Sequence, residues 1–258
     1  MQMHITNKEI YKKNILIDHT LIIKEIDRSI KFYNWDFILS FLPSGSFLVG
    51  GYIRDIILGR LTSAIDVDIV VPRNAIEIGK KITCNSQGKL IILDKDRDVA
   101  RIIFDHITID IASQISSSIQ IDLSSRDFSI NAIAFSFEEK LLIDPLNGIK
   151  DIQISLLRTY SKQNLIDDPL RILRCFRFVA ELNFNIDENL KHFVKKYKNK
   201  LSIVAKERIN YELQRIIRGE RAIKSILLIN KFKIFNYIQS EKNLIFNDLE
   251  KINFAEFN

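Results

Sequence analysis

Residues 47–71 read FLVGGYIRDIILGRLTSAIDVDIVV and carry the most regular pattern of the chain. An apolar run ends in two glycines. A short segment with helical apolar spacing follows and closes on a glycine, and a final run alternates before it becomes fully apolar. These patterns are typical of strand, helix and strand in turn. We therefore expect a strand and tight turn at 47–51, a short helix at 52–60 and a strand at 65–71.

The second of these strands carries two carboxylates, Asp66 and Asp68. Side chains two residues apart on a strand point to the same face, so the two carboxylates would lie side by side. Such a pair stays ionised only beside a cation, and Mg²⁺ is usually held by one or two carboxylates together with substrate phosphates. Gly50 and Gly51 would let a phosphate approach the backbone closely. The combination indicates metal-assisted phosphoryl chemistry, although a lone pair of this kind is more often a solvated strand end.

A third carboxylate, Asp110, lies within the apolar run ITIDIA at 107–112. If that run is a neighbouring strand, Asp110 could complete a two-metal catalytic site with Asp66 and Asp68. The alternative is an edge-strand aspartate that points to water. The pattern itself leaves both interpretations open.

The spacing of apolar residues changes from a strand pattern to a helical pattern partway along the chain. We expect an α+β module at 1–150, with a helical extension over about 1–42, and an all-helical module at 151–258. Further strands are expected at 89–94, 99–105, 107–112 and 140–145. Helices are expected at 74–82, 168–182, 187–198, 203–218 and 220–232, and a helix opening or helix–strand junction at 126–135.

Composition and charge narrow the class of protein. The chain has 258 residues, of which 47% are hydrophobic and only 8 are Gly and 4 are Pro, which excludes a collagen-like, linker-like or largely disordered chain. Two cysteines make no disulfide framework, the four histidines lack metal-ligand spacing, and no apolar run is long enough to cross a membrane. Residues 1–150 carry a net charge of −1 and residues 151–258 a net charge of +7. The basic second part indicates a polyanionic partner, or else a solvated Lys-rich surface.

Five segments, in order, resemble the motifs of one known family. They are FLVGGYIRDIILGR with the DVD that follows it, SRDFSINAIAF (125–135), IDPLNGIKDI (143–152), DDPLRILRCFRFVAEL (167–182) and KERINYEL (206–213). The set resembles class II tRNA nucleotidyltransferases and bacterial poly(A) polymerases, which belong to the DNA polymerase beta superfamily. Five ordered motifs are far more specific than any one of them. The resemblance implies a polymerase-beta-like nucleotidyltransferase head, a mixed sheet with helices, followed by a helical neck and a truncated body.

The expected helix at 168–182 has a polar face suited to recognising a base. That face carries Asp168, Arg171, Arg174 and Arg177. The opposite, apolar face carries Leu173, Phe176 and Ala180. An Asp can accept from an exocyclic amino group and an Arg can donate to a ring acceptor, a pattern that cytosine and adenine match and that guanine and uracil do not. In the family the matching Asp and Arg select CTP and ATP in this way, whereas the alternative for such a pair is an i, i+3 surface salt bridge.

The resemblance also assigns nucleotide contacts to Arg126, Asp127 and Asn131. A guanidinium can fork onto phosphate, and a carboxylate and an amide can bond a ribose 2′-OH. The alternative is a cluster that caps a helix N-terminus. Ser125 stands where the family usually has the first of two arginines, which removes one possible phosphate contact.

Three further pairs of charged residues lie in the motifs. Arg54 and Asp55 follow the glycine turn and fit an ion pair that braces the head as well as a substrate contact. Arg174 and Arg177 could reach a triphosphate or an RNA backbone. Glu207 and Arg208 are expected to orient a neck helix rather than to take part in chemistry.

The implied reaction is template-independent addition of C and/or A to the 3′ end of tRNA, with Mg²⁺ as cofactor and CTP and ATP as substrates. Alternatives are a poly(A) polymerase, which shares nearly every motif, a non-catalytic RNA-binding relative, and nucleotidyl transfer to a small molecule. Family members are commonly longer, which leaves three alternatives: a minimal form of the enzyme, a homodimer that grips the RNA, or a second protein that does so. Because the N-terminal segment lacks targeting features, the expected location is the cytoplasm, with an organelle that encodes the chain as the alternative.

Overall fold

The computed structural model describes residues 18–33, 35–61 and 65–238. The contacts between residues divide the chain into two compact units, and the boundary along the chain falls between Tyr160 and Ser161. This division falls after the predicted change of module at residue 150, because helix α6 (Gly148–Gln153) packs on the 3₁₀ turn η1 (Ser129–Asn131) of the first unit. Within the described ranges, no helix is both long and apolar enough to cross a membrane.

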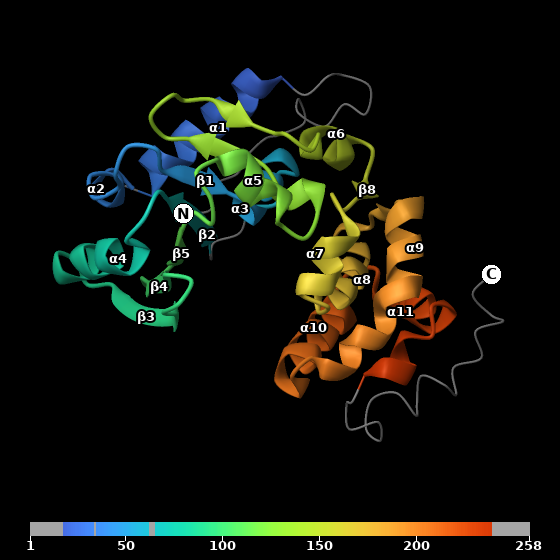
Figure 1. Cartoon of the computed structure of the whole chain (residues 1–258). Helices are drawn as coiled ribbons and strands as arrows, with labels where there is room; N and C mark the ends of the chain where they lie inside the picture. The colour runs from blue at the N-terminus through green and yellow to red at the C-terminus, as the bar shows by residue number, and fades with distance from the viewer. Residues whose placement is uncertain (1–17, 34, 62–64, 239–258) are drawn as a thin grey trace. The chain divides into compact units, whose positions relative to one another are not determined.

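A seven-stranded sheet forms the centre of the first unit (Figure 1). The strands lie in the order β3-β4-β5-β2-β1-β6-β7, with β2 and β5 parallel and every other neighbouring pair antiparallel. They are β1 (Phe47–Val49), β2 (Ile65–Val71), β3 (Lys89–Asp94), β4 (Val99–Ile103), β5 (Ile107–Ser113), β6 (Ala134–Ser136) and β7 (Leu142–Ile143). The strands predicted at 65–71 and 89–94 have these bounds, and the other predicted strands are present with shifted ends.

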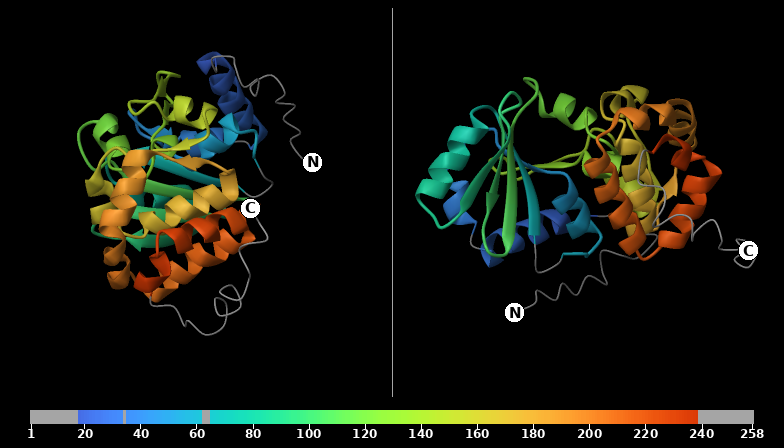
Figure 2. Two further views of the ribbon diagram at one scale, coloured as in Figure 1. Left: turned by 90° about the vertical axis from the view of Figure 1, so that its right-hand side faces the viewer. Right: turned by 90° about the horizontal axis from the view of Figure 1, so that it is seen from below.

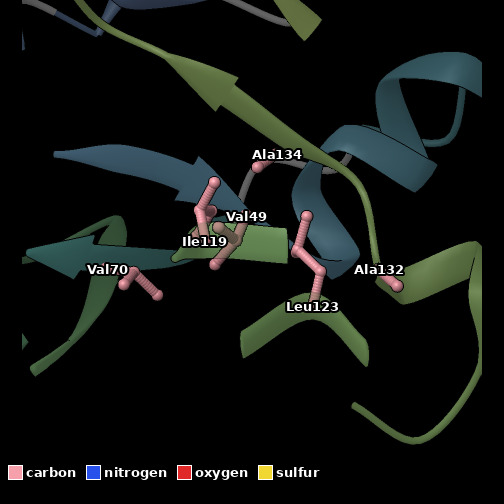
Figure 3. Close-up of a cluster of buried hydrophobic side chains, with 6 residues drawn as sticks. All are labelled: Val49, Val70, Ile119, Leu123, Ala132 and Ala134. Carbon is pink, nitrogen blue, oxygen red and sulfur yellow. The ribbon is translucent and has the colours of Figure 1, made fainter. Parts of the chain in front are cut away.

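Helices pack on both faces of this sheet. On one face, α4 (Ala75–Cys84) lies against β3, β4 and β5 (Figure 2), and Gly79 lets it approach Leu90 closely. On the other face, α5 (Ile119–Ser124) packs on β1, β2 and β6. The buried cluster there contains Val49, Val70, Ile119, Leu123, Ala132 and Ala134 (Figure 3). Because strand residues alternate, the face that carries Val70 also carries the carboxylates of β2.

Two helices precede β1 in the chain and a third follows it. Helix α1 (His19–Phe32) begins after Asp18, whose side chain accepts a hydrogen bond from the Thr20 amide, and it buries Ile22, Ile26 and Ile30 while packing on α3. A short α2 (Asp36–Leu39) follows, and α3 (Gly51–Ile57) begins directly after the glycine turn. The helices predicted within 5–42 therefore correspond to α1 and α2, and the part of that prediction before residue 18 lies outside the described residues.

The second unit is almost entirely helical, as the loss of strand pattern predicts. Its elements are α7 (Lys162–Asp167), α8 (Arg171–Leu182), β9 (Asn185–Ile186), α9 (Glu188–Tyr197), η2 (Lys198–Ile203), α10 (Lys206–Arg218), α11 (Ala222–Lys231) and η3 (Ile234–Tyr237). Helix α8 packs on α10 and α11, and the Ser225 hydroxyl donates to the Phe176 carbonyl at 2.7 Å. Leu173, Phe176 and Ala180 are fully buried, which confirms the predicted apolar face of this helix.

Several local predictions were wrong or incomplete. The segment 126–135 forms η1 and leads into β6, so the predicted junction is a 3₁₀ turn rather than an α-helix. Short elements α5, α6, α7 and β8 (Leu156–Leu157) were not anticipated, because segments of two to six residues carry too few apolar repeats to show a period. The helix predicted from residue 168 begins instead at Arg171.

The turn IDPLNGIKDI joins α6 to the segment that carries Asp127 and Asn131. Asp144 accepts hydrogen bonds from the Gly148 and Ile149 amides at 2.7 and 2.9 Å, and burial raises the pKa of this carboxyl. The Ser129 hydroxyl donates to the buried Asp151 at 2.5 Å. The motif therefore acts as a clamp on η1 from within the first unit.

Gly148 makes this clamp possible, and replacing it tests the account. A Cβ at this position would lie 2.1 Å from the Ser129 carbonyl oxygen, which is backbone and cannot move aside. We expect Gly148→Ala to lower the free energy of unfolding by about 3 kcal/mol or more in urea denaturation. The control is Lys150→Ala, an exposed position in the same helix, which should change it by less than about 0.5 kcal/mol. Equal stability of the two variants would contradict the clamp.

Candidate active site

The two carboxylates of β2 lie on the face of the sheet that α5 partly covers. Asp66 is exposed and Asp68 half-buried, while Ile65, Val67 and Ile69 between and beside them are buried on the opposite face. Asp68 pairs in register with Val49 on β1 and with Asp110 on β5. The alternation of IDVDIVV therefore puts both acids where a ligand can reach them.

Gly50 brings two of the predicted residues to one place. Its backbone has φ 79° and ψ −134°, a conformation that residues other than glycine rarely adopt. A Cβ on Gly50 would lie 2.9 Å from an Asp68 carboxylate oxygen and 2.9 Å from an Arg126 guanidinium nitrogen. The turn is fixed by the Gly50 amide, which donates to the Ile133 carbonyl at 3.0 Å. Asp68 and Arg126 thus converge on a spot that carries no side chain.

A hydrogen-bonded chain connects the glycine turn with the RDFSIN segment. Arg54 donates to both oxygens of Asp55, at 2.9 and 2.8 Å, and to the Asn131 side-chain oxygen at 2.6 Å. Asn131 in turn donates to Asp127 at 2.9 Å, and the same Asp127 oxygen accepts from the Phe128 amide at 2.8 Å. Asp127 and Asn131 are only 6% exposed, so their orientations are set by these bonds. Arg54 therefore braces the head through Asp55 and also orients Asn131.

Arg126 reaches the same region from the C-terminal end of α5. Its Nε lies 3.5 Å from a carboxylate oxygen of the buried Asp122, one helical turn earlier. This ion pair restrains the Nε side of the guanidinium. A terminal nitrogen of Arg126 lies beside Gly50, 2.9 Å from the position that a Cβ would take there. The guanidinium is about three-quarters buried, with 23% of the side chain exposed, which strengthens its field toward an anion.

Asp110 has a close partner that the sequence analysis did not identify. Arg101 lies opposite Asp110 in the β4–β5 register and donates to its two oxygens at 2.6 and 2.7 Å. Hydrogen bonding to Asp110 raises the pKa of Arg101, and the charges of Asp110, Asp66 and Asp68 act in the same direction. Among the described residues, no group of three or more His, Cys, Asp or Glu side chains is arranged to hold a metal ion. The alternation in VARII could have revealed Arg101, because it places this side chain on the face opposite Ala100 and Ile102.

In the second unit, Asp168 does not lie on the helix that was predicted to carry it. It follows α7 in an extended conformation, with φ −136° and ψ 93°, and α8 begins three residues later. The reason is Pro169, since a residue before proline is disfavoured in the helical region. Asp168 still lies at the start of α8, where its carbonyl accepts from the Arg171 amide at 3.1 Å.

Asp168 and Arg171 are held by different partners. The two oxygens of Asp168 accept from Arg208 on α10 at 3.2 and 3.0 Å, so the carboxylate is anchored from a second helix. Arg171 donates to the Asn164 carbonyl at 3.1 Å. The alternative interpretation of the pair, an i, i+3 salt bridge, differs from these contacts, which join each side chain to another partner. Arg208, which was expected only to orient a helix, touches the proposed base-reading residue directly.

Arg177 does not belong to the exposed polar face that the helical spacing predicted. It is 4% exposed and donates to the equally buried Glu212 of α10 at 3.0 Å. Burial lowers the pKa of Arg177 to about 10, and the nearby Arg174 acts in the same direction. Its guanidinium also lies 4.5 Å from the ring centroid of Phe178. Arg177 therefore joins α8 to α10, while Arg174 remains 31% exposed.

The Arg177–Glu212 pair gives a stability prediction. Arg177→Leu leaves Glu212 buried without its nearest cation, so we expect the free energy of unfolding to fall by about 3–5 kcal/mol. The double variant Arg177→Leu/Glu212→Leu should recover most of that loss, because no buried charge remains unpaired. Both are measured by urea denaturation, with Lys191→Leu, at the solvent-facing pair with Glu188 on α9, as a control that changes stability by less than about 1 kcal/mol. A double variant no more stable than the single one would contradict the unpaired Glu212 charge as the cause of the loss.

Comparisons with known proteins match both units. A sequence family described as the poly A polymerase head domain matches residues 46–158, and one described as the probable RNA and SrmB-binding site of polymerase A matches residues 183–243. A CC-adding tRNA nucleotidyltransferase of Synechocystis sp. is 38% identical over 208 residues, which are 81% of this chain and 50% of that protein. An A-adding tRNA nucleotidyltransferase of Deinococcus radiodurans is 32% identical over 192 residues, 72% of this chain and 43% of that protein.

The fold is similar to solved structures as well. The Thermotoga maritima CCA-adding enzyme, solved in complex with tRNA, aligns with a TM-score of 0.72 and 31% identity over 85% of this chain and 55% of that one. The chain thus spans about half the length of the curated relatives it matches. With matching family descriptions, relatives and fold, the chain belongs to the family of poly(A) polymerases and tRNA nucleotidyltransferases.

Proposed function

We propose that this chain is a template-independent RNA nucleotidyltransferase that adds C and/or A to the 3′ end of tRNA. The proposal rests on the convergence of Asp68 and Arg126 at Gly50, where a Cβ would meet both at 2.9 Å. A carboxylate suited to a divalent ion and a guanidinium suited to phosphate thereby border one side-chain-free spot. The likeness to tRNA nucleotidyltransferases supports tRNA as the acceptor.

Asp66 and Asp68 are the residues that would hold Mg²⁺. Both are oxygen donors on one face of β2, and the cradle at Gly50 leaves room beside Asp68 for a phosphate that would supply further oxygen ligands. When bound, Mg²⁺ would activate the terminal 3′-hydroxyl and neutralise charge on the α-phosphate and the departing pyrophosphate. The protein's part is to hold the two carboxylates on one face of the central strand of the sheet, with Asp66 exposed and Asp68 half-buried.

Arg126 would bind the triphosphate. The ion pair with Asp122 restrains its guanidinium, so less conformational freedom is lost when an anion binds. Gly50 contributes by having no side chain between Arg126 and Asp68. The triphosphate would therefore lie between a cation that attracts it and a carboxylate that shares its metal.

Asp127 and Asn131 would contact the ribose through atoms that the hydrogen-bonded chain orients. Because Arg54 donates to the Asn131 oxygen, the Asn131 amide group is fixed with its nitrogen toward Asp127. A 2′-hydroxyl can both donate and accept, so a fixed carboxylate and amide would favour ribonucleotides over deoxyribonucleotides.

Asp168 and Arg171 would read the base. Asp168 can accept from the amino group of cytosine or adenine, and Arg171 can donate to the neighbouring ring nitrogen. Arg208 donates to both oxygens of the Asp168 carboxylate and restricts its rotation. Uracil and guanine lack this arrangement of an amino group next to a ring acceptor. With either base the Asp168 oxygens would face another acceptor, and this unpaired contact selects against UTP and GTP.

The basic second unit would hold the RNA backbone. Exposed lysines and arginines line α9 and α10, within the segment that matches the family description of an RNA-binding site. Binding through phosphates should weaken steeply as salt increases. A poly(A) polymerase remains the second candidate, because the first family description carries that name, and product length on tRNA separates the two.

The first prediction concerns the carboxylates. On tRNA trimmed of its CCA end, with labelled CTP and ATP and Mg²⁺, the chain should extend the RNA, and Asp66→Asn or Asp68→Asn should lower the rate by roughly 100-fold or more. The control is Asp105→Asn, an exposed acid after β4, which should retain the rate. tRNA binding should persist in every variant. Undiminished incorporation in Asp66→Asn/Asp68→Asn, or binding by the unaltered chain without turnover, would reject the proposal.

The second prediction concerns the base. Asp168→Ala should lower the preference for CTP and ATP over UTP by roughly 10- to 100-fold, because one of two paired contacts to the base is lost. The measurement is kcat/KM for each nucleotide on tRNAs that end before CCA, after C and after CC, with sequenced products. Asp167→Ala is the matched control, since that side chain is exposed and accepts from Gln163 on its own helix. An unchanged nucleotide preference in Asp168→Ala would exclude it as the base-reading residue.

A further inference from the structure

A row of charged residues crosses three adjacent strands of the sheet. Arg101 on β4 pairs in register with Asp110 on β5, and Asp110 pairs in register with Asp68 on β2. Register partners in neighbouring strands point to the same face, so these three side chains and Asp66 share one surface. Three carboxylates and one guanidinium thus stand on a face where the proposed function needs a divalent ion.

Within this row, Asp110 and Arg101 are matched to each other. Arg101 donates through Nε to one oxygen of Asp110 at 2.6 Å and through a terminal nitrogen to the other oxygen at 2.7 Å. Such a forked pair is the strongest geometry between these groups, and it uses the in-plane positions of both oxygens. The two side chains are 42% and 28% exposed, so solvent and ions reach them.

The consequence for a divalent ion has two parts. To become a metal ligand, Asp110 would have to give up at least one of two charge-assisted hydrogen bonds. At the same time, the positive charge of Arg101 opposes the approach of a second cation to Asp68, one strand farther along the row. The charge of Arg101 acts on Asp66 as well, but Asp66 lies on β2 opposite Thr108 and takes no part in the Arg101–Asp110 hydrogen bonds.

We propose that Arg101 is an internal counter-ion that reserves Asp110, so that divalent ions are held by Asp66 and Asp68 without Asp110. Asp110 is then a positioning residue for Arg101, and Arg101 keeps the affinity of the two remaining carboxylates for a free ion low. This inference rests on the proposed function, because it concerns the same metal site. It also explains how ion binding would depend on the nucleotide, since phosphate oxygens must complete the ligand set.

The test is titration of the full chain with Mn²⁺ in the absence of nucleotide, followed by electron paramagnetic resonance. The decisive variant is Arg101→Gln/Asp110→Asn, because it removes one positive and one negative charge and leaves the net charge of the row unchanged. Its Mn²⁺ affinity should equal that of the unaltered chain within threefold. Arg101→Gln alone should bind Mn²⁺ roughly 5- to 10-fold more tightly, because an ionised Asp110 becomes available and a repelling charge is gone.

Two results would overturn the inference. A loss of tenfold or more in Mn²⁺ affinity in the double variant would make Asp110 a ligand, and unchanged or weaker binding in Arg101→Gln would remove the counter-ion role. If Arg101→Gln fails to fold, as thermal melting would reveal, Arg101→Lys replaces it. That variant keeps the charge, so its affinity should rise by less than threefold.

Failure of the inference is distinguishable from failure of the proposed function. Asp66→Asn and Asp68→Asn should each weaken Mn²⁺ binding in both the unaltered and the Arg101→Gln chain. If they do not, the metal site itself has been misplaced. If they do while the double variant loses affinity, only the role of Arg101 and Asp110 is wrong.

Discussion

The parallel pairing of β2 with β5 fixes the positions of Asp66, Asp68 and Asp110 relative to one another. It sets Asp68 beside Asp110, and the antiparallel partners on either side add Arg101 and Val49 to the same face. A slip of one residue in β2 would turn both of its carboxylates toward the buried face and expose Val67 and Ile69. Burial of those apolar residues therefore stabilises the sheet and, by the same register, presents the acids to solvent.

The site depends next on backbone that only certain residues allow. Gly50 at φ 79° permits the approach of Asp68 and Arg126, and Gly148 permits the contact of α6 with the Ser129 carbonyl that steadies η1. In the second unit, Pro169 ends helical geometry at Asp168 and leaves its carboxylate to Arg208. At the two glycines the absence of a side chain, and at Pro169 a restriction on the backbone, decides where a neighbouring polar side chain lies.

Much of this arrangement could be predicted from sequence, and the exceptions have physical causes. The period-two pattern of IDVDIVV gave the bounds of β2 and the common face of its acids, and the family motifs pointed to Arg126, Asp127 and Asn131. Helical spacing placed Arg177 wrongly on the exposed face because the method treats every Arg as solvent-facing, whereas Arg177 is buried in an ion pair with Glu212. The alternation in VARII places Arg101 on the polar face, but its pairing with Asp110, 9 positions away, needs the strand register, and the pairing of Arg208 with Asp168, 40 positions away, comes only with the fold.

In the proposed function, Asp66, Asp68 and the Gly50 turn hold a nucleotide and its divalent ion on one face of the sheet. The most direct measurement is a crystal structure of the full chain with Mn²⁺ and a non-hydrolysable CTP analogue, using the anomalous signal of manganese. We expect manganese bound between Asp66 and Asp68, with the triphosphate against Gly50 and Arg126 and the Arg101–Asp110 pair intact. Manganese bound away from β2, or a triphosphate that contacts neither Gly50 nor Arg126, would contradict it.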